Sequence, residues 1–218
     1  MGWADRLQID LAGGTRIGVI GIVPSYNDRT TIEACITSLL PVTNRIVAVD
    51  GRFSDFPGET DYSTDGTIEY LEGQGVEVIR AAGLQEVEKR NRYLVGQVGD
   101  WYLHLDADEE WTGPLEIPDA DMGIVKLCRA RPIHYMDRVR LFRHVEGLHY
   151  EKKHYWLHDG EGRTFALLEK PGDNYTASRL DNNLIIHHEE DRLPDRRNAK
   201  RQYYRILTKR ENPIRETK

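Results

Sequence analysis

The chain has 218 residues, of which 39% are hydrophobic and 30% are charged. This composition is ordinary for a globular protein, and the length is sufficient for one good hydrophobic core. No apolar run approaches the ~20 residues of a membrane-spanning helix, and the charged N-terminus lacks the apolar core of a secretion signal. Only two cysteines are present, which excludes a disulfide-rich scaffold and leads us to expect a cytoplasmic location.

The net charge of −6 is distributed unevenly along the chain. Residues 191–218 contain ten Lys or Arg and four Asp or Glu, so this tail carries +6 while residues 1–190 carry −12. A basic tail on an acidic body is compatible with an anionic partner, such as a nucleic acid, a phosphorylated glycan or an anionic lipid. The alternative is a solvated basic helix, and helical periodicity is expected over residues 193–212.

Strand and helix patterns alternate through the first half of the chain. Residues 17–23 form a continuous apolar run, which is typical of a strand buried on both faces. Further strands are expected at residues 45–49, 76–80 and 101–105, and helices at residues 30–40, 67–75 and 85–97. Short connections between alternating elements predict an α/β fold with a mainly parallel central sheet flanked by helices.

Polar side chains follow three of these expected strands, at the points where the strands end. They are Ser25, Tyr26, Asn27, Asp50, Asp106 and Asp108. In parallel sheets, ligands bind beyond the carboxyl ends of the strands. The sequence therefore predicts that these residues share one rim and form a binding site.

Two aspartates, one residue apart, follow the strand at residues 101–105. Residues i and i+2 of an extended segment point to the same side, so Asp106 and Asp108 can converge on one cation or on one ribose–diphosphate group. Mg²⁺ and Mn²⁺ are often bound by one or two carboxylates, while water and phosphate oxygens complete the coordination shell of the ion. Such an ion would neutralise charge on a departing nucleoside diphosphate. The alternative is a solvated acidic turn.

Several segments, in this order and at this spacing, resemble family 2 glycosyltransferases and their GT-A-fold relatives. They are IVPSYNDRTTIEACITSLLP, IVAVDGRFSD, STDGT and EKRNRYLVGQVGDWYLHLDADEEW. The resemblance covers roughly residues 17–111, about half of the chain. It implies a metal-dependent transfer of a sugar from a nucleoside-diphosphate donor to an acceptor hydroxyl. Uridine is the expected base, with guanosine and thymidine as alternatives, and the acceptor is an unidentified glycan, protein or nucleic acid.

The resemblance implies roles for the residues after the first two strands. Pro24, Tyr26 and Asn27 would line the pocket for the base and ribose, and Asp50 would accept a hydrogen bond from the base. Asp65 belongs to a segment that normally follows within a few residues, whereas about twelve residues intervene here. Asp65 is therefore expected either to contact the donor or to cap a helix.

The resemblance also implies how the diphosphate would be held. Arg90 matches the basic residue that faces the diphosphate, with a surface helix charge as the alternative. Asp106 would contact the ribose and the metal, and Asp108 the metal directly, where it would assist catalysis. In several GT-A enzymes a late histidine supplies a further metal ligand. Adjacent residues on a strand face opposite ways, so only one of His187 and His188 can join the site, with His187 favoured.

The second half of the chain has a different pattern. Strands are expected at residues 122–129, 137–144 and 182–188, and residues 145–180 are rich in loops and aromatic side chains. Residues 138–159 resemble the acceptor-side segment of bacterial transferases related to those of the lipopolysaccharide core. Tyr155 stands where that segment has a carboxylate.

An inverting transfer needs a carboxylate that deprotonates the acceptor hydroxyl. The candidates are Glu110, Asp159 and Glu189, and the sequence does not choose among them. A retaining mechanism stays open if the late histidine dominates the site.

Two other functions are compatible with parts of the sequence. LAGGTR (11–16) resembles the Gly-rich loop of sugar nucleotidyltransferases, although it precedes the first strong strand whereas such loops follow it. A non-catalytic nucleotide-sugar-binding protein would keep the fold but have a degenerate site, whereas the Asp-Ala-Asp and Arg-Asn segments are intact here.

We therefore predict a single GT-A-type domain over residues 1–218, with a nucleotide-sugar-binding half at about 17–111 and an acceptor-side half at about 112–218. The oligomeric state is not indicated.

Overall fold

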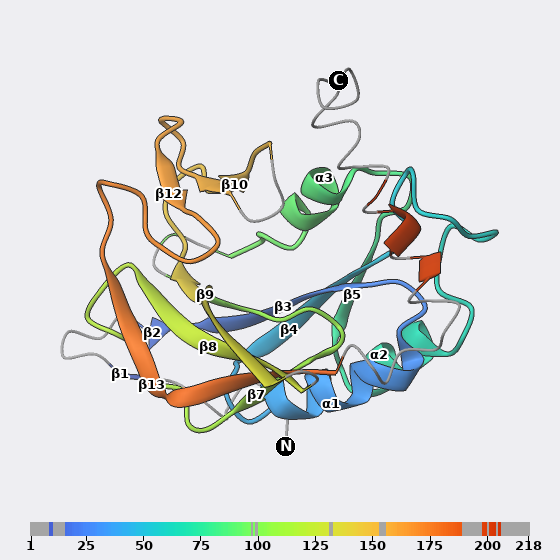
Figure 1. Ribbon diagram of the computed structural model, residues 1–218, viewed down its shortest axis with the longest axis horizontal. Coiled ribbons are helices and arrows are strands. Elements are labelled where there is room, and N and C mark those ends of the chain that lie inside the picture. Colours follow the sequence, from blue (N-terminus) through green and yellow to red (C-terminus); the bar gives the residue numbers. More distant parts are fainter. Residues whose placement is uncertain are drawn as a thin grey trace.

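An eight-stranded sheet in the order β5-β4-β3-β6-β9-β8-β13-β7 forms the centre of the computed structural model (Figure 1). The structure describes residues 9–10, 16–96, 98, 100–130, 133–152, 156–188, 198–199, 201–203 and 205. The strands of this sheet are β3 (Val19–Ser25), β4 (Arg45–Asp50), β5 (Glu77–Arg80), β6 (Trp101–His104), β7 (Glu109–Thr112), β8 (Met122–Ala130), β9 (Ile133–Arg143) and β13 (Ala177–His187).

The first four strands of this order are parallel to one another, as the sequence predicts. Ser25 of β3 pairs with Asp50 of β4, and Ile22 of β3 pairs with His104 of β6. Parallel neighbours end at the same edge of a sheet, so the residues that follow β3, β4 and β6 lie along one rim. The rim predicted from the strand-end residues therefore exists.

The other half of the sheet is mixed. β9 is antiparallel to both β6 and β8, whereas β13 is parallel to β8 and antiparallel to β7. Within the described residues, four of the seven pairings of this sheet are parallel. The prediction of a mainly parallel sheet thus holds for the part formed by β3 to β6, and the later strands add the antiparallel pairs.

Three helices lie where the sequence predicts them. They are α1 (Arg29–Leu39), α2 (Thr67–Gly73) and α3 (Glu86–Asn91). Helix α3 is shorter than the predicted 85–97. The Asn91 side chain at its end donates to the backbone oxygen of Tyr150 at 3.0 Å and accepts from the backbone nitrogen of Tyr150 at 2.6 Å. This reciprocal pair anchors the chain at the point where α3 ends.

Apolar side chains cover both faces of the sheet. On one face, Ile32 and Ile36 of α1 and Leu71 of α2 pack with Leu103 of β6. On the other face, Tyr102 of β6 packs in a second cluster that includes side chains of the small sheet described next. Figure 1 shows α1 and α2 on one side of the central sheet and α3 with the small sheet on the other. Because layers cover the sheet on both faces, the side chains of β3 are buried on both sides, which explains its continuous apolar run.

Several strands lie in segments where the sequence predicts none. β10 (His149–Tyr150), β11 (Leu157–His158) and β12 (Thr164–Ala166) form a small antiparallel sheet, and β7 follows Asp108 directly. Near the N-terminus, β1 (Ile9–Asp10) pairs with β2 (Arg16–Ile17). Most of the LAGGTR segment lies outside the described residues.

The C-terminal part of the chain is described only in pieces. Residues 198–199, 201–203 and 205 are helical, in agreement with the helix expected over 193–212, and the rest of that segment lies outside the described residues. Across the described residues, the structure contains no helix with the length and apolar character needed to cross a membrane.

Asp65 joins the beginnings of α1 and α2. One carboxylate oxygen accepts the backbone N–H of Arg29 at 2.9 Å, and the other accepts the backbone N–H and the hydroxyl of Thr67 at 3.1 and 2.6 Å. The first backbone N–H groups of a helix have no partner within the helix, so a side-chain acceptor stabilises both helices.

Asp65→Ala is expected to lower the free energy of unfolding by about 1 kcal/mol because two helix starts lose their acceptor. Urea unfolding followed by circular dichroism measures this change. Asp61→Ala is the matched control, since Asp61 is an exposed carboxylate of the preceding loop that pairs with Arg52. Equal stability of the two variants would contradict the capping role.

Candidate active site at the carboxyl ends of the parallel strands

Asp50, at the end of β4, is fully buried and hydrogen-bonded. Its Oδ1 accepts the hydroxyls of Ser25 and Ser63 at 3.2 and 2.5 Å, and its Oδ2 accepts the backbone N–H of Ser63 at 3.0 Å. Asn27, in the left-handed region at φ 50°, donates its backbone N–H to the Ser63 hydroxyl at 2.7 Å. The structure thus brings Asn27 and Asp50 together, with Ser63 between them and covering Asp50.

Tyr26 and Pro24, the other residues expected at the base and ribose, are held by contacts within the rim. The Tyr26 hydroxyl donates to the backbone oxygen of Thr60 at 2.7 Å, and its ring packs edge-on against Phe56 at 5.9 Å. Pro24 is half-buried within β3, where it pairs with Val49. Both residues therefore support the rim, and their contact with a base stays a prediction.

Lys89 is a buried residue of the rim that the sequence did not single out. Its Nζ donates to the backbone oxygens of Ser25 and Gly51 at 2.7 and 2.5 Å and lies 4.8 Å from the centroid of the Phe53 ring. A buried ammonium group is tolerated where it is hydrogen-bonded, and these two bonds fasten the ends of β3 and β4. The only sequence signal was its position beside Arg90 in the KRN segment.

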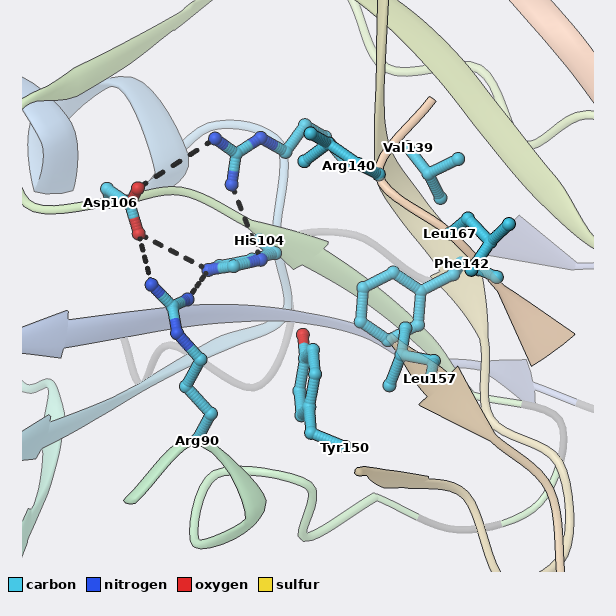
Figure 2. A pocket seen from close by; sticks show the side chains of 11 residues that line it. Arg90, His104, Asp106, Val139, Arg140, Phe142, Tyr150, Leu157 and Leu167 are labelled. Carbon is cyan, nitrogen blue, oxygen red and sulfur yellow. Dashed lines mark hydrogen bonds and ion pairs between the residues drawn. The ribbon is translucent and has the colours of Figure 1, made fainter. Parts of the chain in front are cut away.

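Arg90, the predicted diphosphate-facing residue, contacts Asp106 in the core of the rim (Figure 2). Its Nη2 donates to Asp106 Oδ1 at 3.0 Å and to Glu86 Oε1 at 3.2 Å, and its Nη1 lies 2.5 Å from His104 Nε2. The guanidinium is almost completely buried. The surface-charge alternative for Arg90 is therefore wrong.

A second arginine approaches Asp106 from β9. Arg140 Nη2 donates to Glu109 Oε1 at 2.5 Å and lies 3.9 Å from Asp106 Oδ2, while Arg140 Nη1 lies 3.4 Å from His104 Nδ1. Figure 2 shows His104 between the two guanidinium groups, with Asp106 bridging them. Neither His104 nor Arg140 was among the predicted site residues.

This arrangement shifts the pKa values of its members in different directions. Burial would raise the pKa of Asp106, but Arg90, His104 and Arg140 outweigh burial and hold that pKa well below its ordinary value. Burial lowers the pKa of His104 to about 3, against the opposing effect of Asp106. Burial raises the pKa of Glu109 to about 7, although Arg140 opposes it. At neutral pH Asp106 is thus charged and His104 neutral.

A narrow cavity of about 60 Å³ opens beside this network. Polar side chains of Arg90, His104, Asp106 and Arg140 form one wall, and apolar side chains of β9, β11 and the segment after β12 form the other. The Asp106 side chain keeps 30% of its surface exposed. One water needs roughly 10–15 Å³ of such space, so the cavity accommodates a small group and not a whole nucleotide sugar.

Asp106 and Asp108 have different partners. The expectation that they point the same way assumed an extended backbone, whereas the N–H of Glu109 bonds to the oxygen of Asp106 at 2.9 Å and closes a turn. Asp108 is buried, and its Oδ2 lies 3.0 Å from His187 Nε2. Within the part of the chain that the structure describes, no group of three or more His, Cys, Asp or Glu is placed to hold a metal ion.

The two late histidines contact different carboxylates. His187 contacts Asp108, and His188 Nε2 lies 3.0 Å from Glu110 Oε2. This follows from the pairing of β13 with β7, in which Ile186 lies opposite Glu110. The opposite orientation of the two histidines agrees with the prediction that only one of them meets the aspartate.

The two candidate bases that the structure describes, Glu110 and Asp159, lie in different places. Glu110 lines a groove between α1 and β7, apart from the cavity beside Asp106. Asp159 holds the turn between β11 and β12, where its oxygens accept Arg163 Nε at 2.7 Å and the Tyr175 hydroxyl at 2.5 Å. Burial would raise the pKa of Asp159, but these bonds outweigh it and keep the pKa well below its ordinary value. Glu189 lies outside the described residues.

Comparison with known proteins gives only a partial likeness. No protein-family model matches the chain, and no curated protein matches it. The crystal structure of S. aureus TarS 1–349 is 19% identical over 52% of this chain and 36% of that one, with a TM-score of 0.39. The same TarS segment in complex with UDP gives 20% identity, the same coverage and the same TM-score. A further TarS structure is matched over 22% of its length. The chain thus spans about a third or less of these structures, and a likeness of this extent assigns no function.

The pKa of His104 makes stability depend on pH in a defined direction. Because folding lowers this pKa from 6.5 to about 3, the unfolded chain binds more protons between these values. The contribution of His104 to the free energy of unfolding therefore falls as the pH falls from 6.5 toward 3, by up to about 1.4 kcal/mol per pH unit. Glu109 acts in the opposite sense, because folding raises its pKa from 4.5 to about 7.

The contribution of His104 is obtained by comparing the free energy of unfolding of wild type with that of His104→Gln, since Glu109 is present in both proteins. Between pH 6.5 and 4.5, wild-type protein is expected to lose more stability than His104→Gln, as measured by urea unfolding at each pH. His134→Gln removes an exposed histidine and serves as the control. Parallel stability profiles for wild type and His104→Gln would show that His104 is not held neutral.

Proposed function

We propose that this chain transfers a sugar from a nucleoside-diphosphate donor, with a UDP-sugar as the expected donor, to an acceptor hydroxyl. One observation carries the proposal: neighbouring strands end at a common rim that presents Asn27, Asp50 and Asp106, with Arg90 against Asp106. These are the positions that the family 2 resemblance assigns to donor binding. In this proposal residues 17–111 bind the donor and residues 112–218 form the acceptor side.

The charges of the rim suit the parts of such a donor. Asp50 is a hydrogen-bond acceptor for a base N–H, beside the ribose position at Asn27. Asp106 is ionised and partly exposed, so it can accept a hydroxyl of the ribose or of the sugar. Arg90 lies next to it and carries the positive charge that a diphosphate requires. Because Glu86 and Asp106 already fix the guanidinium, Arg90 is held ready for the donor.

In this proposal a divalent cation binds near Asp108 and His187. These two side chains face each other at 3.0 Å, and a carboxylate oxygen with an imidazole nitrogen is a donor pair suited to Mn²⁺. The Nδ1 atom of His187 is buried and has no hydrogen-bond partner within the described residues. Asp108 and His187 would hold Mn²⁺ or Mg²⁺ together with the donor diphosphate and water, while Asp106 would contact the donor. When bound, the ion would neutralise charge on the leaving group.

Of the two candidate bases that the structure describes, Glu110 is better suited than Asp159, and Glu189 stays a candidate. Both oxygens of Asp159 are occupied by hydrogen bonds and its pKa is low, which makes it a weak base. Glu110 keeps 36% of its side chain exposed and has His188 as a partner. Glu110 is therefore proposed to accept the proton of the acceptor hydroxyl, with the acceptor entering along the groove between α1 and β7.

Donor binding is tested first with nucleotides. Thermal-shift measurements with UDP, GDP and TDP in the presence of Mn²⁺ are expected to show the largest rise in Tm with UDP. Asp50→Asn should weaken UDP binding about 10-fold, since an interaction with a charged acceptor is lost, while Mn²⁺ affinity changes less. Asp61→Asn, a change at an exposed carboxylate of the following loop, is the control. Unchanged UDP affinity in Asp50→Asn would remove Asp50 from the base pocket.

Metal dependence is tested at Asp108. Asp108→Asn should keep the fold, because Asn retains an acceptor for His187, and should reduce UDP release from a UDP-sugar by about 100-fold or more. Glu72→Gln, on the exposed surface of α2, is the matched carboxylate-to-amide control. Circular dichroism verifies the fold of both variants. Full activity in Asp108→Asn, or of wild type in EDTA, would rule out the metal assignment.

A further inference from the structure

An aromatic cluster covers the carboxyl ends of β3 and β4. It consists of Tyr26, Phe53 and Phe56 together with Tyr203 from the C-terminal helical residues. Figure 1 shows the red helical piece beside the segment that connects β4 to α2, on the side of the molecule where β4 and β5 end. Tyr203 is only 2% exposed. The C-terminal part of the chain is thus packed onto the rim.

The ring of Tyr203 lies almost flat against the ring of Phe53. Their centroids are 5.5 Å apart and their planes differ by 15°, whereas Phe56 meets Tyr203 at the same distance but at 54°. Phe53 is held over the strand ends, since Lys89 Nζ lies 4.8 Å from its centroid and donates to the backbone oxygen of Gly51. The stacked pair therefore lies beside the end of β4, three residues beyond Asp50.

A nucleobase that bonds to Asp50 needs a flat apolar surface to stack on. Phe53 offers such a surface next to Asp50, and in this structure the Tyr203 ring occupies it in the near-parallel geometry that a base would adopt. Base–aromatic stacking and pairing between aromatic side chains are similar in strength. One stacked ring can therefore replace the other at little net change in free energy.

We infer that Phe53 is the stacking surface for the nucleobase of the donor and that Tyr203 occupies this surface until the donor displaces it. The inference rests on the proposed function and extends it to two residues to which the resemblance assigns no role in donor binding.

The experiment measures UDP affinity by calorimetry, with Mn²⁺ present, in the full-length chain. Tyr203→Leu keeps an apolar side chain but removes the stacked ring, and it is expected to bind UDP about 10-fold more tightly than wild type. Adding Phe53→Leu to Tyr203→Leu should remove most of this gain, because the base then has no ring to stack on. Tyr203→Phe should behave like wild type, and Tyr135→Leu, a change of an exposed tyrosine, is the control.

Pyrophosphate is the matched ligand without a base. Its affinity should be the same in wild type and Tyr203→Leu if Tyr203 competes with the base alone. Equal or weaker UDP binding by Tyr203→Leu, in a protein whose circular dichroism matches wild type, would overturn the inference and leave the proposed function in place. Failure of wild type and Tyr203→Leu alike to bind any nucleoside diphosphate would overturn the proposed function together with the inference.

If Tyr203→Leu does not fold, Phe53→Tyr with unchanged UDP affinity supports a stacking surface, and a loss of more than 10-fold overturns it.

Discussion

Two buried arginines that enclose Asp106 determine the geometry of the rim. Arg90 comes from α3 and Arg140 from β9, and both side chains are almost completely buried. A buried guanidinium without a carboxylate partner is strongly unfavourable, so Asp106, Glu86 and Glu109 have to lie against them. The alignment of α3, β6 and β9 therefore reflects charge neutralisation as well as apolar packing, and it places the exposed edge of Asp106 at the cavity.

The same network gives the two aspartates of the Asp-Ala-Asp segment different environments. Asp106 lies between guanidinium groups that hold its pKa low, whereas Asp108 is buried against the imidazole of His187. Carboxylates that are close in sequence take different chemical roles when their surroundings differ in this way. The turn closed by the bond from the Glu109 N–H to the Asp106 oxygen produces the separation, since it leads the chain into β7 directly after Asp108. A single shared function for the pair is therefore less compatible with the fold than a division between donor contact and metal binding.

The strands that build the rim could be predicted because their burial leaves a local signature. A strand covered on both faces must be apolar throughout, and the polar residue that ends it then stands out. This is why β3, β4 and β6, with Asp50 and Asp106 after them, were identified from the sequence. Helix capping by Asp65 could be foreseen only as an alternative, since the same residue type serves capping and ligand binding.

The parts that could not be predicted depend on contacts between distant segments. β7 has the sequence EEWT, which carries two charges and no apolar run, and it is a strand because it pairs with β13 about seventy residues later. The contact of Arg140 with Glu109 and His104 is set by the antiparallel register of β6 and β9, in which Leu103 lies opposite Leu141. The register between distant strands leaves no pattern in the local sequence, so Arg140 was not predicted as a site residue although Arg90 was.

The insertion of residues 51–62 changes what the end of β4 presents to a ligand. Ser63 supplies two hydrogen bonds to Asp50 and Ser25 supplies a third, so the buried carboxylate is satisfied without any ligand. A base N–H must then replace one of these bonds and cannot simply add to them. The exchange of one hydrogen bond for another contributes only about 1 kcal/mol. Selection of the base at this rim therefore depends less on Asp50 alone than on the stacking surface and the charges that lie around it.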